Sequence, residues 1–229
     1  MNISRNILSI SHVGAMLFGI SASSMGCAFM NVPLTMPTAH DVPNTIPGGR
    51  GREIVVASPF ADKRAIQDRC GMQKNGYNMD TADAKCLTDP SEWMAQYLAV
   101  ELRAFGFSVL PPDAAHRPGA VRIDGTLLKL FVEPVIGWWT GSLETDLSVR
   151  LVATSETGLR AERTFFVKGV KKGVAVGTPD SFHESLNLAA RSCAAEMVQA
   201  LIELLDRYPQ LGALQHGSRL AFLVWEVQV

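Results

Sequence analysis

Apolar and polar residues alternate along the middle of the chain. The alternation is regular over residues 121–132 and 143–151, and less regular over residues 160–170. A period of two residues is typical of a strand that buries one face and exposes the other to water. The pattern therefore predicts three consecutive antiparallel strands that form a meander with one wet face.

Two other stretches have the period of an amphipathic helix. The first begins at residues 89–92, Asp-Pro-Ser-Glu, which place an N-cap carboxylate before a proline at the first helical position. Gly106 ends it. The second begins with a capping box of Ser181 and Glu184 and ends at Tyr208-Pro209. Their predicted buried stripes are Met94, Tyr97, Leu98, Leu102 and Phe105, and Leu186, Ala190, Cys193, Met197 and Leu201.

Short apolar runs flank the first helix, at residues 53–58 and 107–110. A strand, a helix and a second strand in this order predict a right-handed parallel crossover. The final run, residues 220–229, predicts another strand, which either completes the sheet edge or pairs with another chain. We therefore expect an α/β (α+β) fold, with a mixed β-sheet that contains the meander and two main helices packed on one face.

The beginning of the chain has the layout of a bacterial export signal. Arg5 precedes an apolar run at residues 7–20, which is shorter than the roughly 20 residues that a transmembrane helix needs. Gly26-Cys27 resembles the lipobox of bacterial lipoproteins, in which the cysteine is lipidated, although Ser24 replaces the usual leucine. Ordinary cleavage nearby, which leaves Cys27 as a free or paired thiol, is the alternative.

These features divide the chain into three parts. Residues 1–26 are the expected signal peptide with its lipobox. Residues 27–52 are rich in Pro, Thr and Gly without a periodic apolar face, which predicts a tether. Residues 53–229 are expected to form a single globular α/β domain, since that length provides a sizeable core.

The four cysteines indicate an oxidising compartment. Cys27 is assigned to the lipobox, and Cys193 lies in the apolar stripe of the second helix, where a buried thiol is usual. Cys70 and Cys86 then remain as a predicted disulfide, which closes a polar loop and stabilises the fold by roughly 3 kcal/mol in the chain-entropy model. A metal site is the competing interpretation, but the closely spaced Cys or His ligands of zinc sites are missing.

Charge and motifs narrow the function classes. The formal net charge is −1, which argues against a nucleic-acid-binding protein because such proteins need a basic face. The histidines lack metal-binding spacing, and no Gly-x-Ser-x-Gly motif is present. Asp62 and Asp124 are isolated acids of the kind that solvent usually surrounds. We expect a protein without catalytic residues, cofactor or metal.

The turn between the first two meander strands is unusually apolar. Residues 133–141 include Ile136, Trp138 and Trp139, whereas hairpin turns are normally polar. Either this turn folds back over the core, or it is a docking or membrane-interface surface, because tryptophan is favoured at both. With Trp225 in the final strand, these residues are the candidate interaction surface.

Three segments carry a resemblance to a known family. They are Ile-Val-Val-Ala-Ser-Pro-Phe-Ala-Asp-Lys-Arg at residues 54–64, Leu-Arg-Ala-Phe-Gly-Phe-Ser-Val at 102–109 and Arg-Ile-Asp-Gly-Thr-Leu at 122–127. With the lipobox and the late helix, they make the chain similar to YajG-type bacterial lipoproteins and, more distantly, to transport-auxiliary and TolB N-terminal-like domains. The resemblance covers residues 54–208, and the Cys70–Cys86 insertion and the C-terminal strand depart from it.

The resemblance implies an accessory role in the cell envelope and supplies no catalytic residues. We expect a periplasmic domain that a lipid at Cys27 anchors to the outer membrane, since Ala28 differs from the aspartate of inner-membrane retention signals. The expected function is that of an accessory or assembly subunit that contacts other envelope proteins. A lipid- or glycan-binding module that serves an envelope transporter is the alternative, which a deep apolar cavity would favour.

Overall fold

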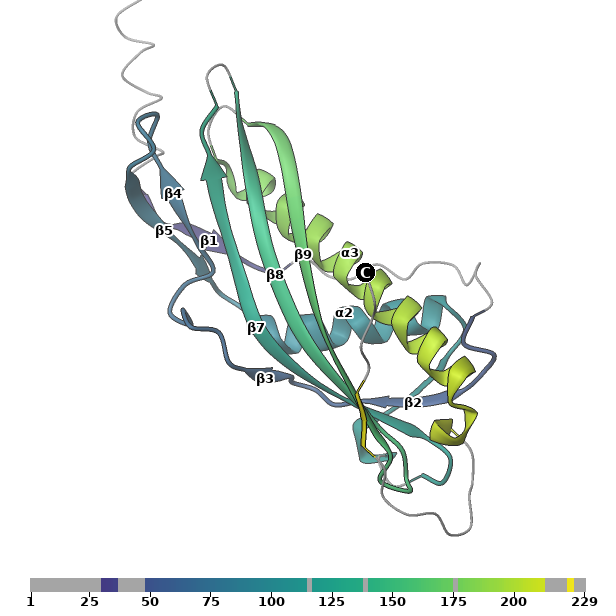
Figure 1. Ribbon diagram of the computed structural model, residues 1–229. Coiled ribbons are helices and arrows are strands. Elements are labelled where there is room, and N and C mark those ends of the chain that lie inside the picture. The colour runs from purple at the N-terminus through teal and green to yellow at the C-terminus, as the bar shows by residue number, and fades with distance from the viewer. Residues whose placement is uncertain are drawn as a thin grey trace, which may run out of the picture.

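The computed structural model describes residues 30–36, 48–114, 117–137, 140–174, 177–212 and 222–224. The strands within these ranges form one ten-stranded mixed sheet. The two α-helices of the described chain, α2 and α3, both cover the same face of this sheet (Figure 1). The predicted fold class is confirmed.

The predicted meander forms the centre of the sheet. Strands β7 (Val121–Val135), β8 (Gly141–Thr154) and β9 (Arg160–Val174) are antiparallel to one another. Burial alternates along β8 as the sequence predicts, with Leu143, Leu147 and Leu151 fully buried toward the helices. The opposite face of the meander is the face turned to the viewer in Figure 1, and it carries charged side chains.

The strand, helix and strand at the beginning of the domain form the predicted parallel crossover. Strand β2 (Glu53–Val56) pairs in parallel with both β6 (Ser108–Leu110) and β7. Helix α2 (Pro90–Ala104) connects them, and its N-cap is Asp89, whose carboxylate accepts a hydrogen bond from the Ser91 amide at 2.8 Å. Gly106 has φ +79°, so it ends the helix in the left-handed conformation that glycine favours.

The segment between the cysteines is a β-hairpin, so the prediction of a polar loop is wrong. After the short strand β3 (Ala61–Asp62), strands β4 (Gly71–Lys74) and β5 (Asp80–Cys86) pair antiparallel, and β4 also pairs with β7. A side chain at Gly71 would collide with the carbonyl oxygen of Val132. Glycine at this position therefore permits the close approach of β4 to the meander.

The predicted tether is also wrong in part, because its residues join the sheet. Strand β1 (Val32–Leu34) pairs in parallel with β5, and Leu34 is fully buried. Pro33 is tolerated because β1 is an edge strand. Further along, Gly49 donates a hydrogen bond to the carbonyl of Phe105 at 2.7 Å. Ordered structure therefore begins before residue 53, where the globular domain was expected to start.

The second helix, α3 (Pro179–Arg207), begins two residues earlier than residue 181. Its capping box joins Thr178 and Ser181, because Pro179 occupies the first helical position. Cys193 is fully buried on this helix, and burial raises the pKa of its thiol to about 12. The thiol is therefore protonated and inert at neutral pH.

Three short elements complete the described chain. They are the 3₁₀ helices η2 (Pro112–Ala114) and η3 (Pro209–Gly212) and the strand β10 (Phe222–Val224). β10 pairs in parallel with the first residues of β9, which confirms a C-terminal strand at the sheet edge. None of the described helices is long and apolar enough to span a membrane.

Candidate interaction surface

The chain enters the sheet at the end where the β4–β5 hairpin turns. β1 and β5 are parallel, with Val32 opposite Ala84, so the beginning of β1 points toward the turn that precedes Asp80. The Asn31 side chain accepts a hydrogen bond from the amide of Asp83 at 3.0 Å. The backbone is therefore fixed to β5 from Asn31 onward.

The loop after β7 lies at this same end. β4 and β7 run in parallel, with Gly71 opposite Val132, so the hairpin turn and the end of β7 point in one direction. The Lys74 ammonium lies 2.7 Å from the Glu133 carboxylate and joins the two strands near their ends. Figure 1 shows the β4–β5 turn and the end of β7 together at the upper end of the molecule.

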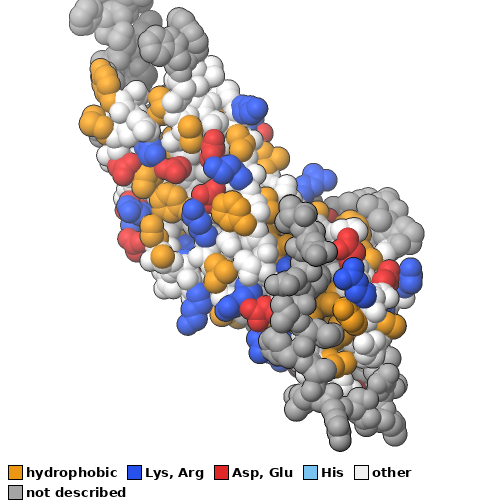
Figure 2. All heavy atoms as spheres, in the orientation of Figure 1, with side chains coloured by type: hydrophobic (Ala, Val, Ile, Leu, Met, Phe, Trp, Pro, Cys, Tyr) orange, Lys and Arg blue, Asp and Glu red, His pale blue; other side chains and the backbone are white. Residues whose placement is uncertain are grey.

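Exposed apolar side chains from all three segments gather there. We call this set the apolar end; its members and exposed fractions are Met30 68%, Tyr77 87%, Met79 57%, Val135 41% and Ile136 39%. Hydrophobic side chains are visible at this end of the molecule in Figure 2. Exposed apolar side chains that lie together at one end make this set a candidate for an interaction surface.

The sequence predicted only part of this surface. Ile136 belongs to it, whereas Trp138, Trp139 and Trp225 lie outside the described residues, as does Cys27. Tyr77 and Met79 were missed because they were assigned to a polar loop. The available signal was that two large apolar residues interrupt the polar segment between the cysteines.

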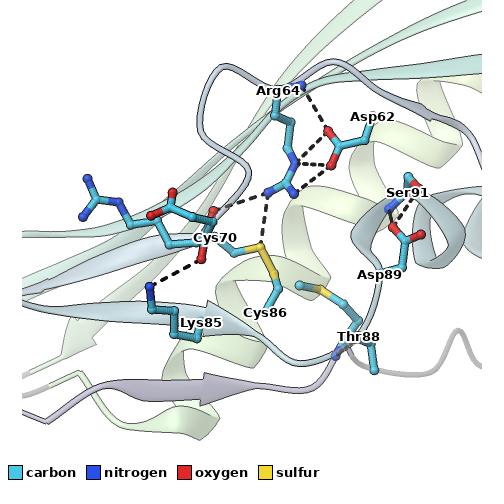
Figure 3. The surroundings of a disulfide bond; sticks show 11 residues. Asp62, Arg64, Cys70, Lys85, Cys86, Thr88, Asp89 and Ser91 are labelled. Atoms are coloured by element: carbon cyan, nitrogen blue, oxygen red, sulfur yellow. Dashed lines mark hydrogen bonds and ion pairs between the residues drawn. A yellow bond between two sulfur atoms is a disulfide. The ribbon is translucent and has the colours of Figure 1, made fainter.

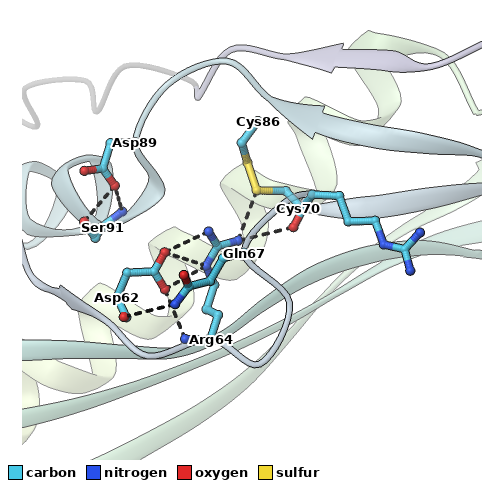
Figure 4. Close-up of polar contacts among 8 residues, drawn as sticks. Asp62, Arg64, Gln67, Cys70, Cys86, Asp89 and Ser91 are labelled. Carbon is cyan, nitrogen blue, oxygen red and sulfur yellow. Dashed lines mark hydrogen bonds and ion pairs between the residues drawn. A yellow bond between two sulfur atoms is a disulfide. The ribbon is translucent and has the colours of Figure 1, made fainter.

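The predicted Cys70–Cys86 disulfide is confirmed, and it joins the beginning of β4 to the end of β5. A buried arginine lies against it. The Arg64 side chain is 4% exposed, and its guanidinium donates hydrogen bonds to the Asp62 carboxylate at 2.9 Å and to the Cys70 sulfur at 3.3 Å. Figures 3 and 4 show Arg64 between the carboxylate and the disulfide.

This arrangement fixes the base of the hairpin. Burial by itself raises the pKa of Asp62, but hydrogen bonds and the charge of Arg64 outweigh it, so the net effect lowers that pKa. Asp62 is therefore a structural partner of Arg64, and it is not the isolated, solvated acid that the sequence indicated. Asp62 and Arg64 are two residues apart, and in an extended chain such side chains point to the same side. This spacing is the sequence signal that could have predicted their ion pair.

Other possible binding features are limited within the described part of the chain. No group of three or more His, Cys, Asp or Glu residues is placed there to hold a metal ion. Two open hollows of about 490 and 460 Å³ lie on the outside of the fold. The larger lies beside Pro59, Arg122 and Asp124, and the smaller beside Arg52 and Asp206, so neither lies between the sheet and the helices.

Comparison with known proteins identifies the fold only. No family model matches the sequence, and no curated protein matches it. A Xanthomonas campestris protein of the DUF330 family is similar in structure, with a TM-score of 0.54, 14% identity and coverage of 78% of this chain and 99% of the other. At that identity, the likeness shows a shared fold, and the resemblance to YajG-type lipoproteins stays a prediction.

A second solved structure, a neuraminyllactose-binding hemagglutinin homologue from Helicobacter pylori, is 12% identical. The match covers 75% of this chain and 96% of the Helicobacter pylori chain, with a TM-score of 0.38. A structural score this low supports no conclusion about the present chain.

Proposed function

We propose that this chain is a lipid-anchored protein of the bacterial cell envelope that acts as a non-catalytic accessory or assembly subunit by contacting other proteins. The export signal and Cys27 support the anchor. The disulfide beside Arg64 supports the compartment, because such bonds persist in oxidising environments and are rare in the cytosol. The anchor would then hold the domain in the periplasm, at the outer membrane.

The observation that carries the contact role is the open face of the meander. Strands of 15, 14 and 15 residues form this face, and both helices lie on the other side. Phe166 points outward near the middle of β9, opposite Ser148, and is 59% exposed. A large aromatic side chain on such a face is the kind of group that anchors protein interfaces.

Charged side chains surround this aromatic residue. Lys129 lies 2.7 Å from Asp146, and Lys168 lies 2.7 Å from Glu144. Figure 2 shows both signs of charge interspersed with hydrophobic side chains over the outer face. An apolar centre with a polar border is the usual composition of a protein interface, since the border keeps the free protein soluble.

The ligand-carrier alternative has less structural support. A lipid carrier holds its ligand in a deep apolar cavity. Here Leu147, Leu186 and Met197 belong to one continuous buried cluster between the sheet and the helices. This continuous packing of the described residues supports contact through the surface.

Lipidation is tested by replacing the proposed anchor residue. Cys27→Ser should move the protein from the membrane fraction to the soluble envelope fraction, because the acyl chains supply the attachment. Fractionation of cells and the mass of the N-terminal peptide measure this. Cys193→Ala is the control and should stay in the membrane fraction. Wild-type protein that is soluble and unmodified at Cys27 would contradict the anchor.

The contact role is tested in intact cells with a photo-crosslinking amino acid at Phe166. We expect one defined envelope protein to be captured, because this side chain is exposed on the open face, near the middle of β9. The matched control is the same amino acid at Leu188, an exposed apolar position on α3. Equal capture from both positions, or no specific product from Phe166, would remove the open face as the contact surface.

A further inference from the structure

We propose that the apolar end rests in the headgroup layer of the bilayer that carries the anchor, so that the domain lies on the membrane and does not stand away from it. This inference depends on the proposed lipidation of Cys27. It assigns the apolar end to lipid and leaves the open face of the meander to protein.

The length of chain before the first fixed residue sets the distance. Two residues lie between Cys27 and Met30, so that Met30 is three residue steps from Cys27, and β5 holds the backbone from Asn31 onward. At about 3.3 to 3.6 Å per residue, the chain from Cys27 to Met30 spans at most about 11 Å. The headgroup layer on one side of a bilayer is about 5 to 8 Å thick. Met30 is therefore confined to that layer or its immediate surface.

The hairpin turn extends beyond this point. Val32 lies opposite Ala84, which places Met30 at about the level of Ala82 on β5. The turn begins at Met79, three residues further toward the same end, or roughly 10 Å along a strand. Tyr77 and Met79 thus project past the point at which the chain leaves the fold.

The chemistry of this end suits an interface between water and lipid. Tyrosine is enriched there, since its ring is apolar and its hydroxyl stays hydrated, and Tyr77 is the most exposed member of the apolar end. Val135 at the end of β7 and Ile136 directly after it add aliphatic surface. A few apolar groups at headgroup depth add to the attachment that acyl chains provide.

Charged side chains also lie at this end: Asp80, next to Met79, and Lys172 are exposed and would stay in the hydrated part of the headgroup layer, whereas two other lysines are paired. Lys74 pairs with Glu133 at 2.7 Å, and Lys171 pairs with Glu184 at 2.7 Å. Paired charges cost less to bring toward a low-dielectric layer than isolated ones. The apolar end consists of described residues, and the inference does not depend on Trp138 or Trp139.

The test places an environment-sensitive fluorophore on the membrane-bound protein. Tyr77→Cys and Met79→Cys are labelled with NBD in the full-length lipidated protein, which is reconstituted on vesicles of phosphatidylethanolamine and phosphatidylglycerol. The introduced cysteine is the reactive one, because Cys193 is buried and Cys70 and Cys86 are bonded. Asp113→Cys in η2 is the matched control: it is exposed and follows β6, whose end lies level with the beginning of β7 across β2, at the opposite end of the sheet.

We expect NBD at positions 77 and 79 to emit at shorter wavelength on vesicles than on the vesicle-free Cys27→Ser protein, and to be quenched by doxyl lipids. NBD at position 113 should show neither change. If the protein floats with vesicles but positions 77 and 79 behave like 113, the inference is wrong while the anchor stands. If the protein does not float, the proposed anchor fails first and the inference falls with it.

Discussion

Phe182→Ala should lower the free energy of unfolding by about 4 kcal/mol, since deleting a buried phenylalanine removes apolar burial and leaves a cavity. Phe182 is fully buried in the first turn of α3. Its ring also lies close to Gly177, where an added Cβ would be 2.7 Å from Phe182 Cε2. A loss of this size is a large fraction of the 5 to 15 kcal/mol that is typical of a whole domain.

Equilibrium unfolding in urea, followed by circular dichroism, measures this change on the lipid-free Cys27→Ser protein. Leu188→Ala is the control on the same helix, because Leu188 is 41% exposed. It should change the free energy of unfolding by about 0.5 kcal/mol or less. Equal losses from the two variants would show that burial at Phe182 does not determine the effect.

Removing the disulfide should lower the free energy of unfolding by about 3 kcal/mol, because the bond limits the unfolded chain over a 16-residue separation. The bond also joins the two strands of the hairpin that carries Tyr77 and Met79. Cys70→Ser/Cys86→Ser tests this, with urea unfolding as the measurement. The same loss should appear when wild-type protein is fully reduced.

The Cys70→Ser/Cys86→Ser protein also controls for effects of the reductant that do not involve the disulfide. Reductant should destabilise the wild type and leave the Cys70→Ser/Cys86→Ser protein unchanged. Wild-type protein that mass spectrometry shows to be reduced, but that unfolds at the same urea concentration as before, would contradict a stabilising role for the bond.

The two helices and the meander could be predicted from the sequence because their signals are local. Asp89 and Pro90 begin α2, and Gly106 ends it, through contacts within a few residues. The alternation in β7 and β8 reflects burial of one face, and this pattern is visible within the sequence of each strand. The beginning of α3 was displaced, because Thr178 and Ser181 are competing caps three residues apart, less than one helical turn.

The apolar end could not be predicted as a unit, because distant segments build it. Ile136 was identified from its place in an apolar turn. Tyr77 and Met79 were placed in a loop, because the four residues of β4 are too few to show a period of alternation. Which strand β4 pairs with depends on its contact with Val132, about sixty positions along the chain. The composition of β4 and its neighbours along the chain therefore does not predict that contact.

The sequence by itself determined the caps of α2, the meander and the Cys70–Cys86 bond, because short-range hydrogen bonding and periodic burial specify elements within their own residues. Tertiary structure decided that Val32–Leu34 is a strand and that Asp62 forms an ion pair with Arg64. The three-residue strand β1 contains a proline and is stabilised only by pairing with β5. The buried guanidinium of Arg64 is likewise stabilised only by the groups that surround it. Those partners exist only once the chain has folded.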